Sequence, residues 1–317
     1  DWAKRLDPEG KVPSIVELLA QNNEILADMQ WIEGNLPTGH RTTVRTGLPT
    51  VAWRLLNQGV QPSKSVTAQV DESCGMLEAW SEVDKDLAML NGNTAAFRLS
   101  EAQAFIEAMN QEMGQTVFYG NSGLAPEEFN GLSVRYSSLS AANGQNIINA
   151  GGAGSDNTSI WLICWGQQTV HGIFPKGSKA GLVHEDLGEV TVETSAGIAG
   201  TRLRAYQDHW QWKCGVALKD WRYAVRIANI DVSNLVAKSS AADLIENMIK
   251  AIHRIPSLGM GKCAFYMNRT VKQMLDIQRR DDVQTGGSLV YNDVDGKLIP
   301  SFRGIPIRTC DAILETE

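Results

Sequence analysis

Histidines are the first residues to test for chemistry, because an imidazole can act as a general base or bind a metal near neutral pH. The chain has five of them: His40, His171, His184, His209 and His253. No two are spaced four apart, as two ligands on one helix face would be, and no His-Glu-x-x-His motif occurs. A metal site would need ligands from distant segments. The sequence therefore predicts no metal and no cofactor.

Other catalytic patterns are weak or missing. His184-Glu185-Asp186 could form an acid–base group, but its polar, glycine-flanked surroundings favour an exposed loop. Residues 172–179 resemble a phosphate-binding loop, yet Ser178 precedes Lys179 where the motif requires the reverse order, and Pro175 removes a backbone amide. No Gly-x-Ser-x-Gly nucleophile motif is present. The sequence predicts that the protein is not an enzyme. The alternative is a soluble α+β enzyme, hydrolase-like, with a site around His184.

The five cysteines are odd in number and far apart in the chain: Cys74, Cys164, Cys214, Cys263 and Cys310. No two have the short spacing that metal sites and redox motifs use. Most have apolar neighbours, which is typical of small buried side chains. We expect reduced thiols and, from them, a reducing compartment.

Composition describes an ordinary globular protein. The 317 residues suffice for about two domains, and 43% of them are hydrophobic and 21% charged. No uninterrupted apolar run approaches the roughly 18 residues of a membrane-spanning helix. The net charge of -7 lacks the basic excess of proteins that grip nucleic acid, so any contact with DNA should be weak and without sequence specificity.

Apolar periodicity predicts the main elements in the first half of the chain. Residues 14–32 have mostly helical spacing after Pro13, which predicts an N-terminal helix. Residues 34–69 are rich in Thr, Val and turn formers without a helical period, which predicts an extended, hairpin-like arm. Residues 94–119 are the most helical stretch, about 39 Å long if Gly114 does not break it.

The rest of the chain alternates in character. Glycines at residues 143–157 predict a loop or linker, and the strand signals between 160 and 230 make the middle third mostly β. A helix capped by Ser239 or Ser240 should end before Pro256. A strand at 263–267, a helix at 271–280 and a final strand at 302–307 should follow. The pattern predicts an α+β fold.

Charges in the arm and after it are segregated by sign. Between residues 36 and 70 every charged residue is basic, and a run of acids follows. The basic residues are Arg41, Arg45, Arg54 and Lys64, and the acids include Glu72, Glu78, Glu82, Asp84 and Asp86. Two interpretations stay open at this point. Both segments can be solvated surface, or the basic arm can lie across an acidic patch on a neighbouring subunit.

Three groups of residues carry a resemblance to a known family. They are residues 32–54, Phe118-Tyr-Gly-Asn121 with Phe129-Asn-Gly-Leu132, and Phe302-Arg-Gly-Ile-Pro-Ile307. In this order they resemble the major capsid proteins of short-tailed phages related to the Bordetella podovirus group, over essentially the whole chain. The resemblance implies the Hong Kong 97-type capsid fold.

That fold implies an N-terminal arm at 1–33, an extended loop at 34–75, a peripheral domain at 76–238 with a spine helix at 94–119, and an axial domain at 239–317. Residues 210–230 resemble peripheral strands and residues 240–310 resemble the axial domain, so a permuted segment order is implied.

The resemblance also implies a function. The protein would self-assemble into hexamers and pentamers of an icosahedral shell around the double-stranded DNA genome. Its partners would be itself, the packaged DNA, and a cement or decoration protein, a scaffold and a portal, with no membrane. It would assemble in the bacterial cytoplasm and reside in the virion. Subunit contacts would then involve Arg41, Arg45, Arg54 and Lys64 with Glu82, Asp84 and Asp86.

Overall fold

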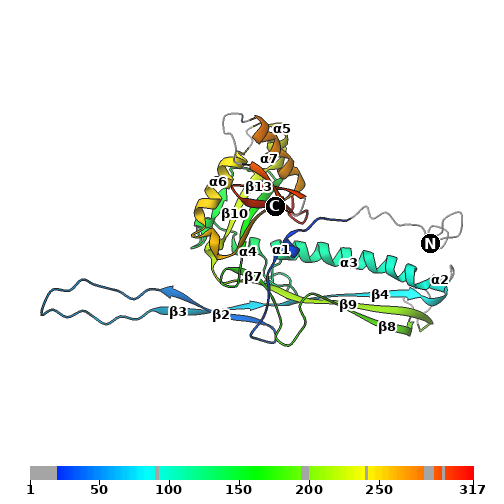
Figure 1. The fold of residues 1–317 in the computed structure, drawn as a ribbon. Helices are drawn as coiled ribbons and strands as arrows, with labels where there is room; N and C mark the ends of the chain where they lie inside the picture. The colour runs from blue at the N-terminus through cyan, green and yellow to red at the C-terminus, as the bar shows by residue number, and fades with distance from the viewer. Residues whose placement is uncertain (1–19, 90–92, 194–199, 240–241, 282–288, 295–296) are drawn as a thin grey trace.

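The computed structural model describes residues 20–89, 93–193, 200–239, 242–281, 289–294 and 297–317. They form a compact body above a flat, elongated body, and a long hairpin projects from one end (Figure 1). One sheet runs through both bodies in the strand order β12-β13-β14-β11-β6-β7-β9-β4. The mixture of helices with this sheet confirms the α+β prediction.

The hairpin is the arm that the sequence predicts. Its strands, β2 (Gly39–Gly47) and β3 (Val66–Ser73), pair antiparallel from the body outwards. Residues 48–65 form the tip and have no helix or strand. The hairpin extends well beyond the rest of the molecule (Figure 1). Such a shape buries little surface within one chain, so its residues are left for other contacts.

The elongated body is a three-stranded ribbon with a helix lying along it (Figure 1). The long strand β9 (Arg202–Leu218) pairs on one side with β4 (Gly75–Asp84) and on the other with β8 (Leu182–Glu193). The short helix α2 (Lys85–Met89) follows β4. The long helix α3 (Thr94–Tyr119) contacts β4 and spans most of the length of the body.

Helix α3 has the limits that the apolar period predicts. Its N-cap is Asn93, whose side-chain oxygen accepts a hydrogen bond from the backbone N–H of Ala96 at 3.1 Å. Gly114 does not break it. A Cβ on Gly114 would lie 2.9 Å from the side-chain nitrogen of Asn23, so glycine lets the N-terminal segment approach the helix closely.

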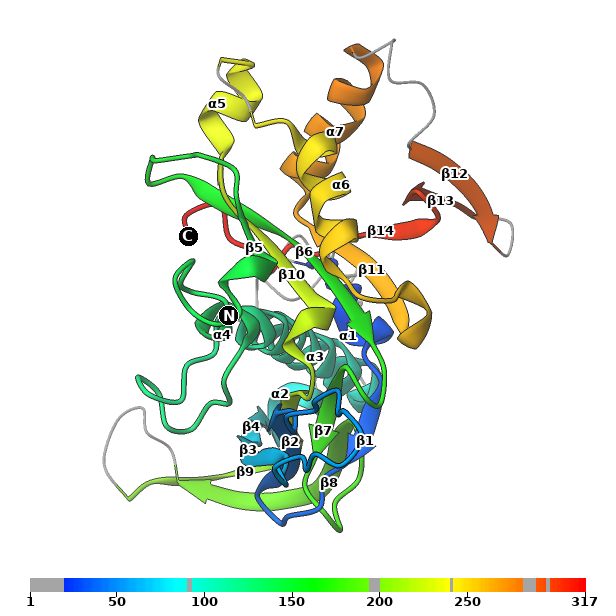
Figure 2. The same cartoon turned by 90° about the vertical axis from the view of Figure 1, so that its left-hand side faces the viewer.

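The compact body is built around a fully buried central strand, β6 (Asn157–Trp165). It pairs antiparallel with β10 (Ala224–Asp231) and with β11 (Lys262–Met267). Two strands extend the sheet in parallel, β5 (Ile147–Asn149) beside β10 and β14 (Ile305–Thr309) beside β11. Strands β12 (Leu289–Val294) and β13 (Lys297–Phe302) lie at the edge in Figure 2. Two short helices also belong to this half of the chain, α4 (Leu132–Arg135) and α5 (Val232–Ala237).

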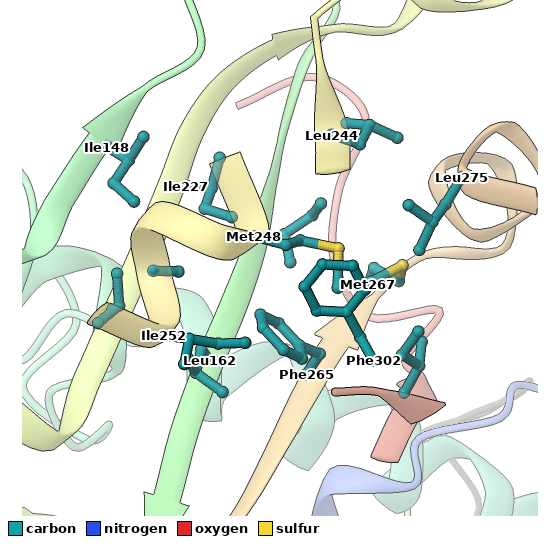
Figure 3. Packing of buried hydrophobic residues seen from close by; sticks show 14 of the residues in the cluster. Ile148, Leu162, Ile227, Leu244, Met248, Ile252, Phe265, Met267, Leu275 and Phe302 are labelled. Atoms are coloured by element: carbon teal, nitrogen blue, oxygen red, sulfur yellow. The ribbon is translucent and has the colours of Figure 1, made fainter. Parts of the chain in front are cut away.

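Two helices cover one face of this sheet, α6 (Leu244–Arg254) and α7 (Arg269–Asp281). Figure 3 shows Met248 and Ile252 of α6 facing Leu162 of β6 and Phe265 of β11. Each such side chain, once buried, stabilises the fold by about 1.5–3 kcal/mol. This core holds the compact body together.

The N-cap of α6 differs from the prediction. It is Asp243, whose carboxylate accepts a hydrogen bond from the backbone N–H of Glu246 at 2.8 Å. Ser239 follows α5 instead, and Ser240 lies outside the described residues. The period identifies the apolar face, but not which polar residue begins the helix.

The N-terminal helix is also shorter than predicted. Residues 14–19 lie outside the described part of the chain, and α1 covers only Ile25–Asp28. Residues Trp31–Glu33 form β1, which pairs parallel with β7 (Val170–Phe174). Residues 25–32, despite their helical apolar spacing, therefore form one turn of helix followed by the start of a strand that pairs with β7.

Two further segments differ from the prediction. Residues 143–157, expected to be a loop, contain β5. The expected strand at 302–307 is the end of β13 and the start of β14, separated by a turn. Arg303 and Gly304 have positive φ, 50° and 82°, and this conformation lets the chain reverse direction between the two antiparallel strands.

The expectation of five reduced thiols is wrong for two of them. Cys164 and Cys263 form a disulfide, because the antiparallel pairing of β6 with β11 places them directly opposite each other. Cys74, Cys214 and Cys310 are free thiols, and burial raises the pKa of each. The cysteines therefore give no support for a reducing compartment.

The chain passes between the two bodies more than once. Strands β6 and β10 lie before residue 239 in the sequence, yet they pair within the sheet of the compact body and share the core of α6 and α7. The limit expected at residue 239 therefore does not separate two packing units. Residues 239–317 form the compact body together with these earlier strands.

Candidate functional site

The basic residues of the arm are exposed, and three of them have no ion pair among the described residues. Arg45, Arg54 and Lys64 form no ion pair with any residue that the structure describes. Arg41 differs, because its guanidinium binds Asp71 on the facing strand, with 2.6 Å between Nε and Oδ1. We call Arg45, Arg54 and Lys64 the basic arm residues.

The tip of the arm also carries exposed apolar side chains, which sequence reasoning did not select as contacts. Trp53 is as exposed as in an extended chain, at 104%, and Leu56 is 90% exposed. The apolar tip residues are Leu48, Val51, Trp53, Leu55, Leu56 and Val60. An apolar cluster on a soluble protein is typical of a binding surface. The signal in the sequence was a Trp and three Leu in an arm with no helical period.

The predicted acidic residues share one end of the elongated body. Glu82 and Asp84 alternate along β4 and are both exposed on the same face, and Asp86 lies in the first turn of α2. Glu82 accepts a hydrogen bond from Gln207, and Asp84 accepts one from the backbone of Asp86. We call Glu82, Asp84 and Asp86 the acidic patch.

The acidic patch has no counter-charge among the residues that the structure describes. None of its three carboxylates pairs with a cation within the described ranges, because Lys85, which lies between them in sequence, binds Glu189 instead at 2.7 Å. Within the described part of the chain, these three charges are therefore left without a cation.

The structure does not bring the basic arm residues and the acidic patch together. The hairpin extends from one end of the molecule, and β4 leads into α2 at the opposite end (Figure 1). A contact between the two surfaces therefore cannot form within one chain.

A buried ion pair fixes the root of the arm, and sequence spacing gave no sign of it. Glu72 of β3 receives two hydrogen bonds from the Arg135 guanidinium of α4, at 2.5 and 2.6 Å, and its side chain is 7% exposed. Arg135 also donates to the backbone carbonyls of Asn130 and Val216, both at 3.1 Å. The arm is thus joined to the body through a paired and almost fully hydrogen-bonded charge.

The group around His184 forms a cross-link between elements. His184 of β8 lies 2.9 Å from Asp208 of β9 and stacks on Trp210. The Asp208 carboxylate also binds Arg98 of α3 at 2.8 Å, and Arg98 binds Asp186. The interactions of this carboxylate connect α3 to the ribbon below it.

Neither a metal centre nor a membrane span is found in the part of the chain that the structure describes. Its residues contain no group of three or more His, Cys, Asp or Glu side chains placed to hold a metal ion. Among the same residues, no helix is both long and apolar enough to cross a membrane.

Comparisons with known proteins give a family and solved structures of similar shape. The family model described as major capsid protein GP7 matches residues 7–317. The chain is similar to a chain in a structure of bacteriophage Epsilon15, with 36% sequence identity and a TM-score of 0.77, over 99% of this chain and 94% of that one.

Two other solved structures show lower similarity. One is the capsid of a native GTA particle, with 8% identity and a TM-score of 0.48, over 71% of this chain and 95% of that one. The other is the SrpI encapsulin complex of Synechococcus elongatus, with 12% identity and a TM-score of 0.44, over 72% and 95%. No curated protein matches the sequence.

Proposed function

The chain belongs to the major capsid protein GP7 family, and from this premise we propose that its arm and its acidic patch are the two sides of a contact between neighbouring subunits. The protein has the Hong Kong 97-type capsid fold and assembles with itself into the shell of a phage, so its place is the capsid of the virion. The contact would join copies of the chain within that shell.

The observation that carries the proposal is that two charged surfaces without ion pairs among the described residues lie at opposite ends of one chain. A contact between two different surfaces repeats from copy to copy and closes into a ring when the rotation allows it. Opposite charges at its two sides fix the register and disfavour wrong pairings. Rings of six and five subunits would be the hexamers and pentamers of the shell.

The apolar tip residues supply what the charges cannot. Exposed ion pairs contribute little free energy, whereas aromatic anchors at the centre of an interface contribute most of it. Trp53 lies beside Arg54 in the tip, so one segment carries both the anchor and the charge. We assign the affinity of the contact to the apolar tip residues and its specificity to the basic arm residues.

We further propose that the two bodies correspond to the domains that the resemblance implies. We propose that the elongated body with α3 as spine is the peripheral domain, and that the compact body is the axial domain near the capsomer centre, with a permuted segment order. Strands β6 and β10 would then belong to the axial domain with residues 239–317, because they pair within its sheet.

The remaining partners follow from charge and family. We propose that the shell encloses double-stranded DNA without sequence specificity, since a chain of net charge -7 holds DNA by confinement more than by affinity. A scaffold, a portal and a cement or decoration protein would complete the particle, which would assemble in the host cytoplasm. The alternative of a hydrolase around His184 has less support, because the Asp208 carboxylate is already bound to Arg98.

Charge reversal tests the proposal. We expect Arg45→Glu and Arg54→Glu each to reduce the yield of shells in negative-stain electron microscopy, and the double variant to reduce it further, with unchanged urea unfolding of the soluble chain. The control is Lys176→Glu/Lys179→Glu, which changes the net charge equally at exposed lysines outside the arm.

A compensating variant sharpens the test. Combining Arg45→Glu/Arg54→Glu with Glu82→Lys/Asp84→Lys in one chain restores opposite charges across the contact, so shells should return. Normal yield from both single arm variants would contradict the proposal. So would a failure of the combined variant to recover while the lysine control assembles.

A further inference from the structure

Two histidines face each other where the arm joins the body. His40 lies near the start of β2 and His171 lies on β7, with ring centroids 5.9 Å apart and the rings nearly perpendicular. His171 is 0% exposed. Neither of its ring nitrogens, nor Nδ1 of His40, has a hydrogen-bond partner among the described residues. Buried polar atoms without partners are uncommon in a packed protein, so each calls for an explanation.

The charged groups that act on this pair are Glu72 and Lys219. His40 is opposite Glu72 of β3, and Glu72 is bound by Arg135 of α4. On the other side, His171 is opposite Ala217 of β9, and Lys219 follows the end of that strand, with Nζ donating to the carbonyl of Gln167 at 3.0 Å. The Glu72 charge is balanced by Arg135, whereas Lys219 has no paired carboxylate among the described residues. A proton added to His171 would therefore place a second positive charge close to Lys219.

We propose that the His40–His171 pair is an acid-sensitive switch at the root of the arm. Uncharged, the two rings pack between β2 and β7 and keep the arm joined to the body. Once His171 is protonated, the closed root must hold a desolvated cation near Lys219, so the root opens and the arm is released. The consequence for the shell rests on the proposed function of the arm, whereas the opening itself does not.

The direction and size of the effect follow from linkage. Burial, then Lys219 and His40, lower the pKa of His171 from 6.5 to about 4. Above pH 6.5 neither the closed nor the open root binds this proton, so opening is independent of pH. Between pH 6.5 and about 4 only the open root binds it, so the opening constant rises about tenfold per unit, up to about 300-fold in total. Below that range both forms are protonated and the rise ends.

Hydrogen exchange of the full-length soluble chain tests the switch. Exchange of the backbone amides of β2 and β3 near the root is compared between proteins at the same pH, so that the intrinsic pH dependence of exchange cancels. The variant His171→Phe keeps a ring of similar volume and removes both nitrogens. The variant His171→Gln is polar but does not titrate, and it serves if the Phe variant fails to fold. His253→Gln, at an exposed position on α6, is the matched control.

We expect the wild type and His253→Gln to lose protection of the root between pH 6.5 and 4 relative to either His171 variant, by one to two orders of magnitude. Equal protection in wild type and His171 variants across this range would overturn the proposal. A pH-dependent opening together with normal shells from the Arg45→Glu and Arg54→Glu variants would contradict the proposed arm contact and still support the switch.

Discussion

Replacing Arg135 by Met is expected to lower the free energy of unfolding by about 3–5 kcal/mol. Met keeps most of the apolar stem and removes the guanidinium. The substitution deletes two charged hydrogen bonds to Glu72, at 2.5 and 2.6 Å, and the bonds to the carbonyls of Asn130 and Val216. The larger cost is that Glu72, 7% exposed, is left as a buried carboxylate without a cation. The effect should centre on the root of the arm.

The control for this prediction is present in the same hairpin. Arg41 also binds Asp71 through two hydrogen bonds, both at 2.6 Å, but the two side chains are 48% and 54% exposed. Water therefore replaces the lost partner in Arg41→Met, and its unfolding free energy should change much less. Urea denaturation of the soluble chain, followed by tryptophan fluorescence, measures both variants.

A second variant separates the cost of leaving the Glu72 carboxylate buried without a cation from the cost of lost packing. In Glu72→Gln/Arg135→Met no buried charge remains, so most of the lost stability should return. Equal destabilisation by Arg135→Met and Arg41→Met would refute the reasoning. The same holds if the double variant is no more stable than Arg135→Met alone.

Two further predictions concern the compact body. Cys263→Ser removes a disulfide that joins residues 99 apart, so its free energy of unfolding should be about 2–4 kcal/mol below that of the wild type in oxidising buffer. Under dithiothreitol the two proteins should be equally stable. Urea denaturation with and without reductant checks this, and an equal difference in both buffers would contradict it. Asp243→Ala removes the N-cap of α6 and should cost about 1 kcal/mol in the same assay, whereas Ser239→Ala should cost almost nothing; the reverse ranking would restore the serine cap that the sequence suggests.

Elements with a strong local signal could be predicted from the sequence. The limits of α3 follow from its apolar period and from polar residues at its start, and both are local properties. The arm was predictable because residues 34–69 lack any helical period and contain many turn formers. The prediction was wrong where pairing with a distant strand decides the secondary structure. Residues 31–33 continue the helical period of the sequence, yet they form β1 because they pair with β7.

Contacts between distant residues could not be predicted. Cys164 and Cys263 are 99 residues apart, and only the register of β6 against β11 makes them neighbours. Glu72 and Arg135 are 63 residues apart, and nothing in their spacing indicates a buried pair. Charge segregation was visible along the chain, but its meaning depends on the opposite positions of arm and patch, which a linear sequence does not contain.

The most direct test of the arm contact is an electron cryomicroscopy map of the assembled shell at side-chain resolution. The proposal predicts that the tip of each arm, residues 48–65, lies against the β4–α2 end of a neighbouring subunit. Arg45 or Arg54 nitrogens should lie within about 4 Å of Glu82 or Asp84 carboxylate oxygens. A map in which the arm lies elsewhere, with the acidic patch facing solvent in every subunit, would contradict it.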